Sequence, residues 1–277
     1  LVILFSNSSN GILRACYCPN SPWGGLAKRA WLVKRIREQV GRENVLLLDA
    51  GDVFPPEIDP ERIPCLLRAY SRMQYDAVAV GDQDLLDGFR TWQKVTREFV
   101  VSNAGAQPFP WLTGGYRVQG GPGLTAPWTI KNTAGYRIGI VSVVGRSAYR
   151  FSATNKLAGV ELTDPVTVVG DFIKAHGSEV DMVIVLSHQG IDADRKLARQ
   201  VNGVDLIIGG HSQSIVCPPE CVNDVMICQA GKNGENLGIL ALSPLVIPDA
   251  DSRSGSAPAA TSTNPFTPSA VSTLKWT

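Results

Sequence analysis

Short hydrophobic segments that end in polar residues recur along this chain, and their pattern predicts buried strands. Four of the segments are nearly continuous apolar runs, which is typical of strands covered on both faces of a sheet. Each run is followed by a carboxylate or an imidazole. Because open α/β sheets place their sites at the carboxyl ends of the strands, we expect these polar side chains to converge. The four segments are residues 46–52, 78–84, 183–188 and 206–213.

Apolar residues spaced three and four apart between these segments predict helices, and Gly41 is placed to end the first of them. Strands and helices therefore alternate, which favours a parallel sheet. Glycine and proline dominate residues 104–134, where we expect an irregular loop that leads into a pair of strands. The expected helices are 25–40, 61–73, 165–176 and 192–201, and the expected strands are 1–5, 45–48, 77–80, 99–103, 128–132, 136–143, 182–186, 206–208, 226–230 and 238–242, the last two of antiparallel type.

The length and composition suit one large α/β domain. The 277 residues are 44% hydrophobic and 18% charged, which is enough apolar material for a single core. We place this domain at residues 1–247. Residues 248–277 are rich in serine, threonine, proline and alanine and cannot bury enough apolar surface to fold alone. We expect this tail to be a linker, or an arm that contacts other protein subunits.

Charge and hydropathy argue against two classes of partner. The formal net charge is +1 and the charges are interspersed, so there is no basic stripe for nucleic acid. No run of about 18 apolar residues is available to span a bilayer. The segment from Leu1 to Phe5 is too short for the core of a signal peptide, so we expect that any targeting segment has been removed or was never present.

The cysteine pattern bears on the compartment. Six cysteines, with two close pairs, suit an oxidising compartment, although metal binding or redox chemistry explains the spacing equally well. Covalent haem is not expected, because Cys217 and Cys221 are one residue too far apart for the Cys-x-x-Cys-His motif and no histidine follows. Cys65 lies among apolar residues of an expected helix, where we expect it to be buried.

The order and spacing of the four polar-ended segments resembles the calcineurin-like metallophosphoesterases. The resemblance is to the catalytic domain of the 5′-nucleotidase and UDP-sugar hydrolase branch, which also includes thiosulfohydrolases. It covers residues 1–245, and its most specific parts are 209–212 (Gly-Gly-His-Ser) and 229–231 (Gln-Ala-Gly). It implies a four-layer α/β/β/α sandwich, metal-dependent hydrolysis and a periplasmic or extracellular location. Relatives continue into a second domain that holds the nucleotide base, which we do not expect in this chain.

The resemblance implies two metal positions, and only one of them keeps its ligands. In the family an Asp-x-His pair and a further histidine hold the first metal ion, and Ser8, Asn10 and Gln213 stand at these three positions. At the second position, two carboxylates and two imidazoles suit one divalent ion of manganese, iron or zinc. The alternative is that these four side chains are relics satisfied by hydrogen bonds. They are Asp52, Asp82, His188 and His211.

Gln83 occupies the position of the family's catalytic histidine. Glutamine donates hydrogen bonds but cannot exchange a proton at neutral pH, and losing acid–base catalysis costs about a hundredfold or more. Two-metal phosphate hydrolysis is therefore not expected. Three functions stay open: weak hydrolysis of phosphorus or sulfur oxyanion esters, a non-catalytic binding or assembly role as a pseudoenzyme, and thiol redox chemistry by Cys16 and Cys18.

The loop before the first helix carries Cys16 and Cys18, followed by a Gly-Gly-Leu-Ala-Lys-Arg string at residues 24–29. This resembles a cysteine-containing, exported offshoot of the family. We expect Lys28 and Arg29 on a solvated helix face rather than at an anion site. Further cysteines are expected near the same end of the sheet as His211. For these cysteines, structural disulfides are favoured over a soft-metal site or a redox pair. These further cysteines are Cys217, Cys221 and Cys228.

Overall fold

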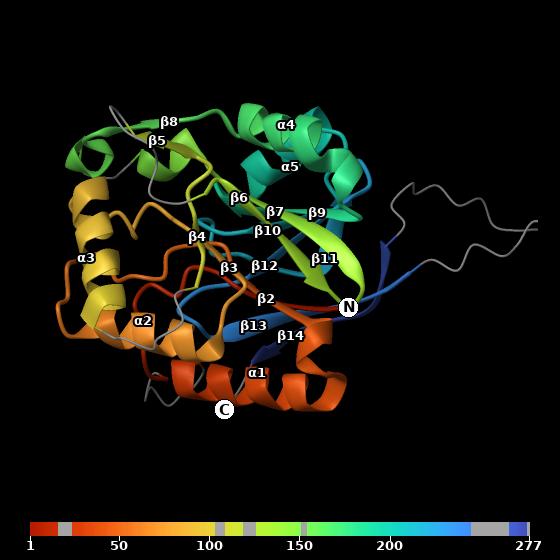
Figure 1. Ribbon diagram of the computed structural model, residues 1–277, viewed down its shortest axis with the longest axis horizontal. Helices are drawn as coiled ribbons and strands as arrows, with labels where there is room; N and C mark the ends of the chain where they lie inside the picture. The colour runs from red at the N-terminus through yellow and green to blue at the C-terminus, as the bar shows by residue number, and fades with distance from the viewer. Residues whose placement is uncertain (16–23, 103–108, 119–125, 151–153, 245–265, 276–277) are drawn as a thin grey trace, which may run out of the picture.

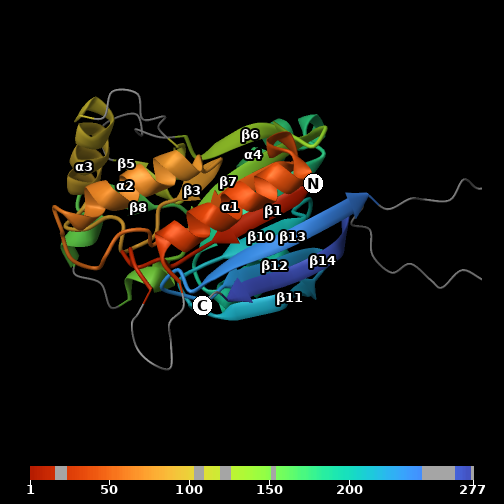
Figure 2. The same cartoon turned by 90° about the horizontal axis from the view of Figure 1, so that it is seen from below.

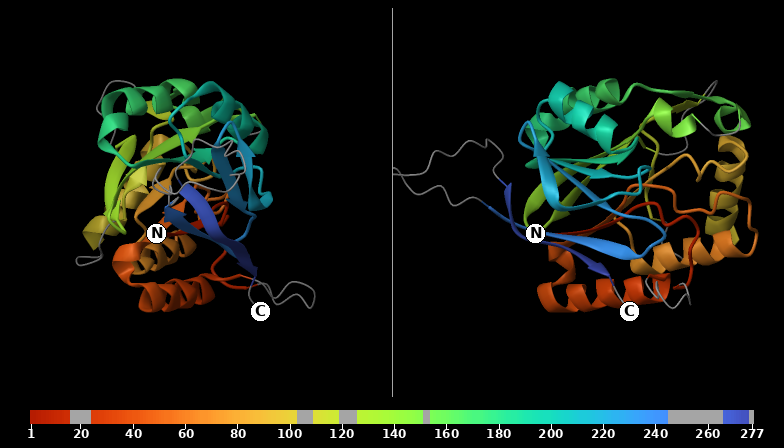
Figure 3. Two further views of the ribbon diagram at one scale, coloured as in Figure 1. Left: turned by 90° about the vertical axis from the view of Figure 1, so that its right-hand side faces the viewer. Right: turned by 180° about the vertical axis from the view of Figure 1, so that it is seen from behind.

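The computed structural model describes residues 1–15, 24–102, 109–118, 126–150, 154–244 and 266–275. Two six-stranded sheets face each other, and a pair of helices covers the outer face of each sheet (Figures 1 and 3). This arrangement confirms the expected four-layer α/β/β/α sandwich. The helices are α1 (Leu26–Val40) and α2 (Arg62–Met73) on one side, α4 (Pro165–His176) and α5 (Ile191–Gln200) on the other, and α3 (Phe89–Ser102) at one end.

The first sheet has the strand order β14-β13-β1-β2-β3-β4. Strands β1 to β4 are parallel, whereas β13 runs antiparallel to β1 and β14 antiparallel to β13. Every residue of β2 is buried, as its continuous apolar run predicts. The bounds are β1 (Val2–Ser6), β2 (Val45–Asp49), β3 (Ala77–Ala79), β4 (Trp111–Leu112), β13 (Asn236–Pro244) and β14 (Phe266–Lys275).

The second sheet has the strand order β11-β12-β10-β9-β7-β6. Its four inner strands are parallel and its two edge strands are antiparallel to their neighbours. The expected antiparallel character of residues 226–230 is thus correct only on the β11 side. The bounds are β6 (Trp128–Thr133), β7 (Tyr136–Val144), β9 (Met182–His188), β10 (Leu206–Gly209), β11 (Ile215–Val222) and β12 (Val225–Ala230).

The remaining elements lie outside the two large sheets. A separate antiparallel pair is formed by β5 (Tyr116–Val118) and β8 (Val160–Leu162). The short 3₁₀ helices are η1 (Arg42–Asn44), η2 (Arg146–Tyr149), η3 (Thr154–Leu157) and η4 (Gly177–Glu179).

Three apolar layers hold the four structural layers together. Alternate residues of β2 point to opposite faces, so Leu46 packs between the sheets while Leu47 packs beneath α1 and α2. Val185 of β9 packs outward in the same way, against Phe172 of α4. Each sheet is covered on both faces, and its strands therefore need apolar side chains in both directions.

Two local expectations are wrong. Residues 99–102 belong to helix α3 rather than to a strand, and Asn103 lies outside the described residues. The buried residues Phe89, Trp92 and Phe99 follow a helical spacing, which outweighs the strand preference of the valines that come after them. The stretch 104–134, expected to be irregular up to the strand pair, also contains β4 and β5, which tertiary pairing holds in place.

The tail contributes a strand to the first sheet. β14 pairs with β13 from the Asn236 and Lys275 pair to the Pro244 and Phe266 pair, and it lies at the outer edge of the sheet beside β11 (Figure 2). A strand added to an existing edge needs no core of its own, because main-chain hydrogen bonds hold it. Residues 266–275, expected to belong to a linker or to an arm that contacts other subunits, thus pair with a strand of their own chain. The boundary at residue 247 stays a prediction.

Candidate metal centre

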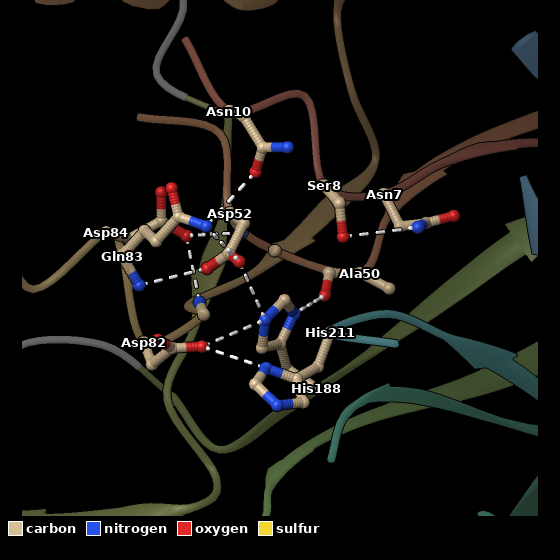
Figure 4. Close-up of polar contacts among 12 residues, drawn as sticks. Asn7, Ser8, Asn10, Ala50, Asp52, Asp82, Gln83, Asp84, His188 and His211 are labelled. Atoms are coloured by element: carbon tan, nitrogen blue, oxygen red, sulfur yellow. Dashed lines mark hydrogen bonds and ion pairs between the residues drawn. The ribbon is translucent and has the colours of Figure 1, made fainter. Parts of the chain in front are cut away.

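The carboxyl ends of the strands bring the predicted polar residues to one edge of the sandwich. Asp52 follows β2, Asp82 follows β3, His188 is the last residue of β9, and His211 follows β10. Parallel pairing puts the ends of β2 and β3 side by side in one sheet and those of β9 and β10 side by side in the other. Because the two sheets face each other, the four loops meet (Figure 4).

Three of the four side chains form a compact group of donor atoms. Asp82, His188 and His211 each offer one ligand atom, and these atoms lie within 4.8 Å of one another. The Asp82 Oδ1 atom is 3.2 Å from His211 Nδ1 and 3.3 Å from His188 Nε2. Asp52 lies beside this group rather than within it, with its Oδ2 atom 3.1 Å from His188 Nε2. Both imidazoles point toward Asp82 in Figure 4.

The orientation of His188 determines what its second nitrogen can do. Its Nδ1 atom lies 2.7 Å from the carbonyl oxygen of Ala50, and because a carbonyl only accepts, Nδ1 carries the hydrogen. The Nε2 atom is buried without a hydrogen bond and faces the carboxylates of Asp52 and Asp82. An unprotonated Nε2 would direct its lone pair at two anions, so this position requires a proton or a metal ion.

Electrostatics at the centre favour bound positive charge. Burial pushes the pKa of His188 down, but the nearby carboxylates of Asp52 and Asp82 outweigh it and hold this pKa well above its ordinary value. Burial pushes the pKa of Asp82 up, but His188 and His211 outweigh it and hold this pKa below its ordinary value. The cluster therefore stabilises ionised carboxylates around a cationic position.

Asp84 is a structural member of the site that sequence reasoning missed. Its Oδ2 atom accepts hydrogen bonds from the main-chain nitrogens of Asp52 (2.9 Å) and Gly81 (2.8 Å), and its Oδ1 atom accepts one from Phe54 (2.8 Å). It thereby joins the loops that follow β2 and β3. Burial and the charge of Asp52 raise the pKa of Asp84 to about 7, against the hydrogen bonds from the backbone. The short spacing Asp-x-Asp at residues 82–84 was the available signal.

The loops of the site adopt unusual backbone conformations. Five of the predicted positions lie in the left-handed region, where residues other than glycine are uncommon. Such conformations persist only when the surroundings enforce them, and they concentrate at functional sites. Gly81 is required by close approach, because a Cβ there would lie closer than 3.0 Å to Asp52 Oδ1. The five left-handed positions are Ser8, Asn10, Asp52, His211 and Gln213.

Two of the positions at which this chain departs from the family, Gln83 and Asn10, form hydrogen bonds beside Asp52. Gln83 donates from Nε2 to Asp52 Oδ2 at 3.0 Å and to Asn10 Oδ1 at 3.2 Å. Asn10 in turn donates to Asn233 Oδ1 at 2.9 Å. Ser8 is buried and accepts a hydrogen bond from the neighbouring Asn7 side chain. Gln213 is partly exposed in the loop after β10.

Arg29 is not on a solvated face, so that expectation is wrong. Its side chain is 0% exposed, and its guanidinium donates to hydroxyl groups of Ser9 and Tyr70 at 3.0 and 3.1 Å. It also lies 4.0 Å from Asp49, a buried carboxylate at the end of β2. Helical periodicity indicates which side of a helix faces inward, but it does not predict that a charged residue on that side will find a buried partner of opposite charge.

A second polar network supports the two histidine-bearing loops. Asp194 of α5 accepts hydrogen bonds from Ser187 Oγ (2.5 Å) and Gln189 Nε2 (3.1 Å), on either side of His188. Gln229 of β12 accepts through Oε1 from Ser212 Oγ at 2.9 Å, next to His211. A Cβ on Gly209 would lie closer than 3.0 Å to both Asp194 Oδ2 and Gln229 Nε2, so these side chains approach each other over that glycine. The sequence identifies Gln229 only as part of the Gln-Ala-Gly string.

The cysteines fall into two groups. Cys16 and Cys18 lie outside the described residues, so their predicted redox or disulfide role stays a prediction. Cys217 and Cys221 of β11 and Cys228 of β12 are free thiols, so the structure does not contain the disulfides expected for them. Burial, and to a smaller extent the neighbouring Cys217 and Cys221 thiols, raise the pKa of Cys228 to about 12. The remaining thiol, Cys65 of α2, is partly exposed rather than buried, so that expectation is wrong.

Comparison with known proteins finds similarity to 5′-nucleotidases. No family model matches the chain. The snake venom 5′-nucleotidase of Crotalus adamanteus is 26% identical over 206 residues, which cover 70% of this chain and 32% of that protein. The chain thus spans about a third of the length of that relative.

Solved structures show the same fold. The 5′-nucleotidase precursor from Thermus thermophilus superimposes with a TM-score of 0.74 at 26% identity, covering 88% of this chain and 51% of that one. The calcineurin-like phosphoesterase YfkN from Bacillus subtilis superimposes with a TM-score of 0.71 at 18% identity, covering 99% of this chain and 89% of that one.

Proposed function

The chain belongs to the calcineurin-like metallophosphoesterase superfamily through the domain that it shares with 5′-nucleotidases, and from this premise we propose a hydrolase whose centre holds one divalent ion. Asp82, His188 and His211 would hold the ion, with Asp52 beside them. The observation that carries the proposal is the buried His188 Nε2 atom, which has no hydrogen bond and faces two carboxylates.

The donor set fits a transition metal ion. Two imidazole nitrogens and carboxylate oxygens suit manganese, iron or zinc. The hydrogen bond from His188 Nδ1 to the Ala50 carbonyl directs the Nε2 lone pair inward, as supporting hydrogen bonds do for metal-ligating histidines. A divalent ion bound there would supply Lewis acidity to the oxygens of an ester.

The groups around Asp52 favour a centre with one metal ion rather than two. Gln83 donates to both carboxylate oxygens of Asp52, from its main-chain nitrogen to Oδ1 and from Nε2 to Oδ2, each at 3.0 Å. A carboxylate bridging two ions would need these oxygens for the metals. Ser8, Asn10 and Gln213 offer a hydroxyl and two amides, which are weaker ligands than carboxylate and imidazole for such ions.

The substrate that we propose is a phosphorus or sulfur oxyanion ester, hydrolysed slowly. Gln83 holds Asp52 in place but cannot transfer a proton, so the leaving group receives no acid catalysis from this position. Nucleotides are the first substrates to test, because the Crotalus relative is named a 5′-nucleotidase. The chain spans only about a third of that relative, so nucleotide specificity is itself a proposal.

The test is metal analysis with a matched histidine control. Protein stripped with a chelator and reconstituted separately with manganese, iron or zinc should bind about one equivalent of a fitting ion. His188→Ala and His211→Ala should each retain less than about a tenth of an equivalent. His176→Ala removes the third histidine of the chain, which lies on α4 beside Glu179, and should bind as the unmodified protein does. Two equivalents, or none, would contradict the single-ion centre.

Ester hydrolysis decides between an enzyme and a binding protein. Turnover of nucleotide monophosphates that follows metal content and is abolished by Asp82→Ala supports the hydrolase. Metal uptake without any turnover would favour the non-catalytic alternative, which the neutral Gln83 motivates. We also propose a periplasmic or extracellular location, supported by the venom relative. No helix among the described residues is long and apolar enough to cross a membrane.

A further inference from the structure

A lysine from a distant segment reaches the loop that carries Asp82. Lys156 lies in η3 and donates a hydrogen bond from Nζ to the main-chain oxygen of Asp82, at 3.0 Å. The two residues are 74 positions apart in sequence, so this contact is tertiary. The side chain of Asp82 contacts both histidines of the centre. The ammonium is therefore held against the main chain of a residue whose side chain belongs to the centre.

The contact leaves the charge of Lys156 available. Its hydrogen-bond acceptor is a neutral carbonyl, and within the described parts of the chain no carboxylate lies at ion-pair distance from Nζ. An ammonium has three N–H donors, and the carbonyl uses one of them. Two donors and the positive charge therefore remain for a ligand beside the Asp82 loop.

The segment that follows β7 lies along the same edge. The Gly145 nitrogen donates to the carbonyl oxygen of His188 at 3.3 Å, and Ser147 Oγ donates to the carbonyl oxygen of Gln189 at 3.3 Å. Residues 145–147 are thereby anchored to the end of β9, and Lys156 is anchored to the loop after β3. Together these contacts hold both segments beside the ends of the strands that carry the metal-binding residues.

The balance of charge between the metal ion, its carboxylate ligands and an anionic substrate indicates a role for Lys156. A divalent ion is neutralised by the carboxylates of Asp52 and Asp82, and the positions that would bring a second ion carry the neutral Ser8, Asn10 and Gln213. A phosphoryl group with two negative charges therefore needs another cation in the centre. We propose that Lys156 is a substrate-binding residue whose ammonium contacts an anionic oxygen of the ester and supplies charge that the missing second ion would otherwise provide. This rests on the proposed function.

The competing explanation is that Lys156 only tethers η3 to the Asp82 loop. Two substitutions separate the roles. Lys156→Gln keeps N–H donors, on a side chain one bond shorter, and removes the charge, whereas Lys156→Met removes both. Lys174→Met is the matched control, because Lys174 is exposed on α4. A tether is sensitive to the loss of the donor, and an anion site is sensitive to the loss of the charge.

The experiment measures binding of inorganic phosphate by calorimetry, in the metal-loaded and in the chelator-treated protein, with melting temperatures recorded alongside. We expect Lys156→Gln and Lys156→Met each to weaken phosphate binding about tenfold, as loss of one charge-assisted hydrogen bond does. The difference from the unmodified protein should shrink as potassium chloride is raised. Lys174→Met should bind phosphate as the unmodified protein does.

The outcomes distinguish this inference from the proposed function. Phosphate binding by Lys156→Gln within about twofold of the unmodified protein overturns the inference and leaves the metal centre standing. No phosphate binding by the unmodified protein at about 10 mM also overturns it. If no metal is taken up, the single-ion centre fails, while a charge-dependent loss of phosphate binding in the same samples still supports Lys156 as an anion-binding residue.

Discussion

Replacing Arg29 tests how much its buried hydrogen bonds and ion pair contribute to stability. The guanidinium is fully buried and donates hydrogen bonds to four hydroxyl groups, at 3.0 to 3.3 Å, and it lies 4.0 Å from the carboxylate of Asp49. In Arg29→Met the side chain keeps an apolar stem but loses every donor. Asp49 keeps hydrogen bonds from Ser6, Tyr70 and the Gly51 nitrogen, with no cation beside it.

The expected loss follows from the burial of both charges. Removing one partner of a buried ion pair costs about 3–5 kcal/mol, because the other charge is left without compensation in a dry environment. Burial already raises the pKa of Asp49, and the charge of Arg29 is the largest influence that lowers it. We therefore expect Arg29→Met to lower the free energy of unfolding by about 4 kcal/mol near neutral pH. The loss should be smaller in acid, where Asp49 takes up a proton.

Urea unfolding of a double-mutant cycle is the assay. Arg29→Met combined with Asp49→Asn should cost at least about 2 kcal/mol less than the sum of the single losses, because the uncompensated charge is gone. Arg35→Met, at a half-exposed arginine on the same helix, should change stability by less than about 0.5 kcal/mol. A loss below about 1 kcal/mol for Arg29→Met, or additive losses in the cycle, would refute this reasoning.

Two further predictions concern pH and metal stoichiometry. Burial raises the pKa of Asp194 from 3.8 to about 7, so the folded protein holds a proton there that the unfolded chain releases. The free energy of unfolding should then fall as pH rises through this interval. Asp194→Asn removes the titrating group, so its free energy of unfolding should fall less over the same interval than that of the unmodified protein. Parallel plots of unfolding free energy against pH for the two proteins would contradict the pKa shift. Restoring the ligand types that the resemblance implies should add a second equivalent of metal, measured by elemental analysis, and an unchanged single equivalent would show that the loops no longer fit two ions. The restoring substitutions are Ser8→Asp, Asn10→His and Gln213→His.

The candidate site was predictable in outline because its members follow apolar runs. Asp52 and His188 each terminate a run whose strand is buried throughout, and parallel pairing makes the ends of such strands meet. The residues that hold the site were not predictable in this way. Asp84 and Asp194 act through main-chain nitrogens and side chains of other segments, and a carboxylate in a polar loop gives no local sign of its acceptor role.

The same contrast applies to the fold. Helix α4 and strand β9 could be read from the spacing of their apolar residues, since a helix or strand that packs on one layer needs its buried side chains at a fixed period. Strand β4 is two residues long and forms because β3 offers it a partner. Strand β14 lies in a stretch of low apolar content and forms because β13 offers an open edge.

The sequence by itself determined the α/β alternation, the buried strands and the chemical types at the centre, because periodicity and residue identity are local properties. The tertiary structure alone decided that Arg29 is buried, that the His188 Nε2 atom faces two carboxylates, and that Lys156 reaches Asp82. Each of these depends on a partner at least 20 residues away in the chain. Such contacts are set by how the two sheets and their loops pack together, which no local pattern encodes.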